Sequence, residues 1–144
     1  MKKYNPPKIL IEKYGQDFIK KYKKWIDNKA AALHKRDRND NLIDPKIIKK
    51  SHYKLAINQS IHETDGRCFY TQIELRWDKI SEIKNENTSL LPTIDHVNRE
   101  KYPLKLVVCA FEINHMKGKM EIKEFISFCE LIIKNKKRIL SNIF

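Results

Sequence analysis

The sequence predicts an α+β fold, because apolar residues recur with helical spacing near both ends of the chain and form strand-like runs between them. Residues 9–33 carry apolar side chains about every four positions, and residues 122–133 repeat them at spacings of three and four. Between these segments, 90–95 and 104–111 are short apolar runs of strand length. We therefore expect helices at the two ends and two short strands between them.

The N-terminal part is predicted to contain two helices separated by a polar stretch. The first covers about 9–33, and residues 34–41 (HKRDRNDN) are all polar or charged, so they are expected to form a loop or a frayed helix end. Asp44 and Pro45 then give a strong start signal for the second helix. Asp can cap free amide groups, and Pro already has the φ of a first helical turn. This helix is expected to run to about His62.

Further along the chain, turn residues and composition divide the second half into short elements. The helical pattern ends near Gly66, and residues 68–75 (CFYTQIEL) are short, aromatic and β-prone. Residues 78–89 are polar and predict a loop. After the two apolar runs, a helix is expected from about Glu112, interrupted near Gly118 and followed by the final amphipathic helix.

The charge of the chain indicates a polyanionic partner. Its 30 Lys and Arg residues against 18 Asp and Glu give a formal net charge of +12. Such an excess attracts polyanions, and nucleic acid is the first of these to consider. A lysine cluster in the first helix fits either a phosphate-contacting face or an ordinary solvated helix surface: Lys20, Lys21, Lys23 and Lys24. We divide the chain into residues 1–63, a helical, basic, candidate nucleic-acid-binding region, and residues 64–144.

Composition also predicts the compartment. The longest apolar runs fall far short of the roughly 18 to 20 residues that cross a bilayer, and no apolar stretch follows the basic N-terminus as in a secretory signal. The three cysteines Cys68, Cys109 and Cys129 form an odd set without close spacing, which indicates reduced thiols. We expect a soluble, cytoplasmic protein without membrane association.

Two short motifs flank the predicted strands. Residues 92–96 (PTIDH) end the first strand on an Asp-His pair, and Asn114 with Lys117 forms an Asn-x-x-Lys motif after the second. Upstream, residues 66–71 (GRCFYT) contain Cys-x-Tyr-Thr. In this order the segments resemble the HNH family of nucleases over about residues 66–131. That resemblance implies a β-hairpin-and-helix (ββα-metal) nuclease core at 64–144 with a C-terminal helix, and it does not extend to the N-terminal helices that the apolar pattern predicts.

The resemblance implies a role for each motif residue. His96 would be the general base that takes a proton from the attacking water, a task that suits imidazole because its ordinary pKa lies near neutrality. Asp95 and Asn114 would bind the metal through oxygen, which favours Mg²⁺ or Mn²⁺. The candidates for phosphate or DNA contact are Lys117, His115, Arg99 and Lys119.

The sequence departs from the family pattern in two places. Family members often carry an Asn at the start of the second strand, where it braces the loop that holds the base, and here Lys105 stands in that region. Either Asn98 or a backbone contact takes over the bracing, or activity is lowered. Many members also hold a structural zinc with two Cys-x-x-Cys pairs, which this chain lacks, so no structural zinc is expected. Packing must then hold the core, with these candidates: Phe69, Tyr70, Val107, Val108 and the last helix.

These observations predict a metal-dependent endonuclease that hydrolyses DNA phosphodiester bonds by His-activated water attack. RNA fits the same chemistry, and a homodimer would allow cuts in both strands. One alternative is a non-catalytic basic nucleic-acid-binding protein, which Lys105 favours, and another is a basic structural protein of a ribonucleoprotein particle. His115 is open between metal ligand, phosphate contact and surface residue, whereas three histidines are expected to face solvent: His34, His52 and His62.

Overall fold

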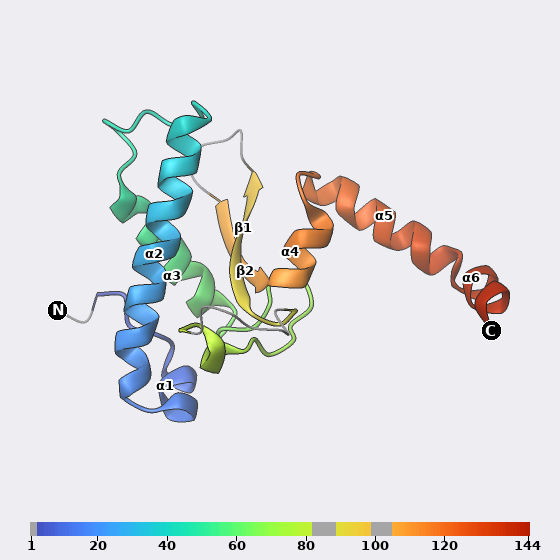
Figure 1. The fold of residues 1–144 in the computed structure, drawn as a ribbon, viewed down its shortest axis with the longest axis horizontal. Coiled ribbons are helices and arrows are strands. Elements are labelled where there is room, and N and C mark those ends of the chain that lie inside the picture. Colours follow the sequence, from blue (N-terminus) through green and yellow to red (C-terminus); the bar gives the residue numbers. More distant parts are fainter. Residues whose placement is uncertain (1–2, 82–88, 99–104) are drawn as a thin grey trace.

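The computed structural model describes residues 3–81, 89–98 and 105–144, and its architecture is α+β (Figure 1). The first helices are α1 (Lys8–Tyr14), α2 (Asp17–Asn39) and α3 (Lys50–Glu63), followed by a short 3-10 helix at Trp77–Lys79. A hairpin of β1 (Pro92–Asn98) and β2 (Lys105–Ala110) precedes α4 (Phe111–Lys117), α5 (Ile122–Lys134) and α6 (Lys136–Ile143). The predicted mixed fold class is confirmed, and the two predicted strands are present with slightly shifted ends.

The first predicted helix is broken once and then extends further than expected. Gly15, with a φ of +83°, separates α1 from α2. The prediction of a loop or frayed end at 34–41 is wrong for residues 34–39, because α2 continues to Asn39. Leu33 and Asp37 are both buried on the inner face of this last part of α2. Tertiary packing therefore keeps a polar stretch helical although its local composition favours a loop.

The second predicted helix begins later than its sequence signal. Pro45 lies in a turn in which the backbone N–H of Ile48 donates to the Asp44 carbonyl at 2.8 Å, and α3 begins only at Lys50. Asp and Pro are also favoured in tight turns, so the same signal marks a turn here. At the start of α3, the backbone N–H of Lys49 donates to Nδ1 of His52.

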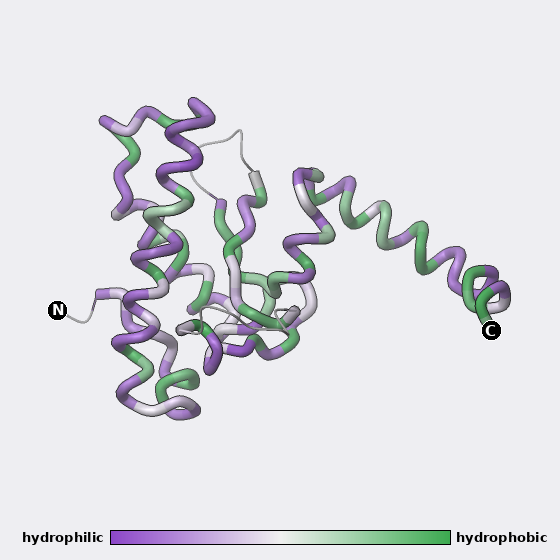
Figure 2. Tube along the Cα trace, viewed as in Figure 1, coloured by the Kyte–Doolittle hydropathy of each residue, from purple (hydrophilic) through white to green (hydrophobic). Residues whose placement is uncertain are grey.

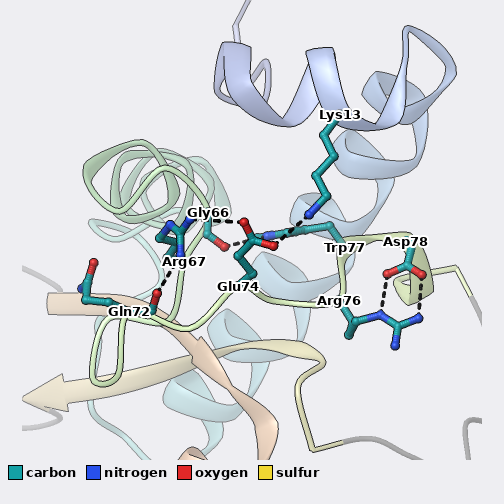
Figure 3. Close-up of polar contacts among 8 residues, drawn as sticks. All are labelled: Lys13, Gly66, Arg67, Gln72, Glu74, Arg76, Trp77 and Asp78. Atoms are coloured by element: carbon teal, nitrogen blue, oxygen red, sulfur yellow. Dashed lines mark hydrogen bonds and ion pairs between the residues drawn. The ribbon is translucent and has the colours of Figure 1, made fainter.

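The β-prone segment 68–75 forms a loop, in which an isolated bridge joins Arg67 and Glu74 and the backbone N–H of Phe69 donates to the Val108 carbonyl of β2 at 2.9 Å. Side-chain contacts also hold the loop (Figure 3). The indole Nε1 of Trp77 donates to the Gly66 carbonyl at 2.8 Å, and the Arg67 guanidinium contacts the Glu74 carboxylate at 3.2 Å. Gly66 has a φ of +77°, and a Cβ added there would lie 2.8 Å from Leu10. The loop is therefore packed tightly against α1.

The hairpin is antiparallel and lies between the helices. Figure 1 shows α2 and α3 on one side of it and α4 on the other. Asp95 pairs with Val107, and the register becomes irregular between His96 and Asn98. Strand β2 also bonds to a helix, because the backbone N–H of Val108 donates to the buried Ser60 hydroxyl of α3 at 2.7 Å.

One hydrophobic core joins residues from both sides of position 63. Its fully buried members from the helices include Tyr22, Ile26, Tyr53, Ile57 and Ile61, and those from later in the chain include Trp77, Val108 and Cys109. Val107 and Val108 are buried as expected, whereas Phe69 is 38% exposed. Cys68 and Cys109 are buried free thiols, and Cys129 is an exposed one.

The prediction that the last helix holds the core is wrong. Neither α5 nor α6 buries any residue, and α5 extends away from the hairpin as a largely hydrophobic helix (Figures 1 and 2). Its contact with the rest of the chain is near its start, where the Phe125 ring lies 6.1 Å from the Tyr70 ring. Among the described helices, none combines the length and apolar character that a bilayer span requires.

Candidate active site

A polar cavity of about 570 Å³ opens where the end of α2, strand β1 and helix α4 meet. Six residues predicted for the site line it: Asp95, His96, Asn114, His115, Lys117 and Lys119. Arg36 of α2, Asp40 directly after α2 and Glu121 directly before α5 add further charged side chains to the lining. The remaining predicted contact, Arg99, lies outside the described residues, as does the Asn98 side chain.

Asp95 is buried and already has two partners. One carboxylate oxygen, Oδ2, accepts a hydrogen bond from the Tyr70 hydroxyl at 2.5 Å. The ammonium of Lys117, at the end of α4, lies 3.3 Å from the same oxygen and 3.4 Å from Oδ1. Burial and the hydrogen bond to Asp95 raise the pKa of Tyr70, so its hydroxyl stays a neutral donor. The site therefore contains a buried carboxylate neutralised by the chain's own lysine.

His96, the next residue on β1, contacts a different element. Successive strand residues point to opposite faces, and here Asp95 contacts α4 while His96 contacts α2. His96 is 6% exposed, and its Nε2 lies 2.9 Å from Oδ2 of Asp37. Both residues still line one cavity, and the register of the hairpin becomes irregular directly after His96.

Asp37 is the acidic partner that the sequence did not reveal. It is fully buried on α2, and its Oδ2 also accepts the Tyr53 hydroxyl of α3 at 2.7 Å. Burial acts to raise the pKa of Asp37, but hydrogen bonds from His96 and Tyr53, with the charges of His96 and Arg36, hold it below its usual value. The carboxylate is therefore ionised at neutral pH and accepts hydrogen bonds without donating any.

One sequence signal for Asp37 does exist. It continues the buried stripe of α2 at spacings of three and four residues, and the stripe reads Tyr22, Ile26, Ala30, Leu33, Asp37. A carboxylate on the apolar face of a helix needs a buried partner, since an isolated buried charge is costly. Because residues 34–41 were not expected to continue the helix, Asp37 was not predicted to lie on its buried face.

The other histidines and Lys105 stand apart from the cavity. The Nε2–H of His34 donates to the Ile48 carbonyl at 2.9 Å, and this side chain is partly buried rather than exposed to solvent as expected. His52 and His62 are exposed as expected. Lys105 is exposed at the start of β2 and is not part of the cavity lining. At the rim, His115 stacks on the Phe111 ring at a centroid distance of 6.1 Å.

The oxygen donors of the cavity fit a hard divalent cation better than a soft one. Asp95 offers a carboxylate and Asn114 an amide oxygen, and no group of three or more His, Cys, Asp or Glu side chains suited to a metal occurs within residues 3–81, 89–98 and 105–144. Mg²⁺ commonly uses one or two carboxylates and completes its shell with waters and substrate phosphates. The same ion at Asp95 would compete with the Lys117 ammonium.

Comparison with known protein families, curated proteins and solved structures found no match to this chain. The chemistry therefore follows from the cavity itself. An imidazole with a carboxylate partner can accept a proton, and a carboxylate beside an amide can hold a hard cation. The cavity lining also includes three cationic residues, which suit an anionic substrate: Arg36, Lys117 and Lys119.

Proposed function

We propose that this chain is a metal-dependent endonuclease of the HNH type that hydrolyses DNA phosphodiester bonds. The observation that carries the proposal is the convergence of Asp95, His96 and Asn114 on one polar cavity. A hairpin followed directly by α4 brings them there, in the element order of a β-hairpin-and-helix nuclease core. The net charge of +12 supports a nucleic-acid substrate.

His96 acts as the general base in this proposal. A water molecule gives a proton to the imidazole, its oxygen forms a new bond to phosphorus, and the bond from phosphorus to the leaving sugar oxygen breaks. The leaving oxygen takes a proton from solvent, and His96 returns its proton to solvent. Asp95 and Asn114 would hold Mg²⁺ or Mn²⁺, which when bound supplies charge stabilisation at the scissile phosphate.

Substrate binding falls to the cations around the cavity. Arg36 comes from α2, and His115 and Lys119 come from α4 and the turn after it, so both sides of the opening carry donors for phosphate oxygens. Contacts of this kind position the backbone of a nucleic acid and carry no sequence information. DNA and RNA share a phosphate backbone, so the cleavage test below includes both as substrates.

The competing function is a basic nucleic-acid-binding protein without turnover. The pairing of Lys117 with Asp95 favours it, because the buried carboxylate is neutralised without any metal. Metal-dependent cleavage separates the two functions, since a binding protein retains nucleic-acid affinity but leaves the strand intact.

The test is cleavage of supercoiled plasmid and of a labelled RNA with Mg²⁺, with Mn²⁺ and with chelator. We expect metal-dependent nicking of the plasmid. His96→Ala should lower the rate about 10² to 10⁴-fold at every metal concentration, because it removes the proton acceptor. Asp95→Ala and Asn114→Ala should recover partly at higher metal concentration, because mass action fills a weakened site.

The exposed His52, which lies outside the cavity, provides the matched control through His52→Ala. This variant should cleave like the parent protein, and His115→Ala should keep most of the activity. Plasmid cleavage that is equal in the parent and His96→Ala proteins, or that persists in chelator, would overturn the proposed function. Cleavage of RNA alone would correct the substrate.

A further inference from the structure

The contact between Asp37 and His96 joins two distant parts of the chain inside the protein. The residues are 59 positions apart, and their side chains are 0% and 4% exposed. Tyr53 donates to the same carboxylate oxygen, so α2, α3 and β1 each contribute one side chain to the arrangement. Arg36 Nε lies 3.6 Å from the other oxygen of Asp37.

The direction of the hydrogen bond follows from the chemistry of its two atoms. An ionised carboxylate only accepts, so the proton between Asp37 and His96 must be on Nε2 of the imidazole. When the ring is neutral, its Nδ1 is therefore bare. That atom is buried, and the described part of the chain offers it no hydrogen-bond partner. A buried polar atom without a protein partner commonly pairs with a bound water, and His96 lines a polar cavity.

We propose that Asp37 is the positioning residue of the active site, which holds His96 in the tautomer whose Nδ1 is free to accept the proton of the attacking water. This inference rests on the proposed nuclease function. Asp37 acts through His96, and its negative charge also favours the imidazolium that forms when the proton arrives. It supplies the bracing of the base that Lys105, exposed outside the cavity, does not supply.

A purely structural role explains the arrangement less well. A buried ionic contact adds little stability compared with apolar side chains of the same volume, because both groups lose their hydration. The hairpin is already attached to α3 through Ser60 and through the shared hydrophobic core. The structure therefore has other means of holding β1 and β2 in place.

The tautomer can be measured in the parent protein without any substitution. Nitrogen-15 NMR of histidine-labelled protein distinguishes a protonated ring nitrogen from a bare one, and His96→Ala assigns the signal. We expect the neutral His96 ring to carry its proton on Nε2. A ring protonated on Nδ1 would overturn the proposal, whatever the cleavage assays show.

The variant test uses Asp37→Asn, which keeps the shape of the side chain and removes its charge. An amide can accept from Nε2–H or donate to a bare Nε2, so the tautomer should become mixed. Single-turnover cleavage should fall about 10² to 10⁴-fold, which is the contribution of a general base. The affinity for Mn²⁺ should not change, because Asp37 is not part of the proposed metal site.

The matched control is Asp27→Asn, since Asp27 lies on the same helix and pairs with Lys54 and Lys50 away from the cavity. It should leave the tautomer and the rate unchanged. If Asp37→Asn cleaves like the parent protein while His96→Ala is inactive, the positioning role is wrong and the nuclease function stands. If the parent protein fails to cleave, the tautomer measurement still decides between the two ring forms.

Discussion

The ammonium of Lys117 lies 3.3 Å from Oδ2 of Asp95, and their side chains are only 3% and 6% exposed. The carboxylate that would bind a divalent ion is thus paired with a cation from two turns along α4. Attraction between such charges is strong where water is excluded. A divalent ion and the lysine would therefore compete for the same oxygens.

Replacing Lys117 with Met should strengthen metal binding and lower the folding stability of the metal-free protein. Removing one partner of a buried ion pair typically costs about 3–5 kcal/mol, because the remaining charge stays desolvated. A divalent ion can then neutralise Asp95 and restore part of that stability. Thermal unfolding with increasing Mn²⁺ should show a larger rise in Tm for Lys117→Met than for the parent protein.

Lys119→Met is the control for this experiment, because Lys119 is exposed and lines the same cavity. Its response to Mn²⁺ should match that of the parent protein. If Mn²⁺ stabilises neither the parent nor the Lys117→Met protein, Asp95 is not a metal ligand.

Affinity for duplex DNA should fall steeply as salt rises. If about four phosphates are neutralised, the slope of log affinity against log salt is roughly −3.6. Arg36→Ala and Lys119→Ala should each make the slope shallower by roughly 0.9, since each removes one phosphate contact. Fluorescence anisotropy over a salt series measures this, and Lys8→Ala, on the exposed face of α1, is the control. A slope near zero contradicts the electrostatic part of the proposal.

Asp37 should make folding stability depend on pH in the acid range. Its pKa is lowered in the folded protein, so its contribution is present above the ordinary carboxyl pKa near 4 and is lost as pH falls through the folded value. The difference in unfolding free energy between parent and Asp37→Asn should therefore shrink below about pH 4, by at most about 1.4 kcal/mol per pH unit. Urea unfolding at several pH values measures it. A constant difference would mean that the pKa of Asp37 is not lowered.

Ser60 should contribute to stability through one backbone group of β2. Its hydroxyl accepts the buried N–H of Val108, and Ser60→Ala leaves that donor without a partner, at a cost of about 1–3 kcal/mol. Urea unfolding should show this loss. Ser51→Ala, at an exposed position of the same helix, should have little effect. Equal stability of the two variants would show that water replaces the hydroxyl.

The sequence predicted the elements whose local pattern and tertiary environment agree. The apolar runs that became β1 and β2 are dense in branched residues, and the helix after them ends at Gly118, where its pattern breaks. The motif residues Asp95, His96 and Asn114 were found because they are short-range features of those elements. Their roles remain predictions.

The predictions from sequence were wrong where contacts between distant residues outweigh the local conformational preference of a segment. Residues 34–41 have the composition of a loop, yet α2 continues to Asn39, and Asp37 within this stretch is buried against Tyr53 and His96. The apolar stripe of α5 predicted burial, although this helix extends from the body with its stripe exposed. A single sequence gives no direct information about pairs separated by tens of residues.

The hydrogen bond between Asp37 and His96 also affects whether the site could be transferred to another protein as one segment. The motifs all lie after residue 66, but the acceptor of the His96 proton lies on a helix near the other end of the chain. A hairpin-and-helix segment moved to another protein would keep the signature and lose this acceptor. In such a chimera, the presence of the motif and the competence of the site are separate properties, and only the second depends on what precedes it.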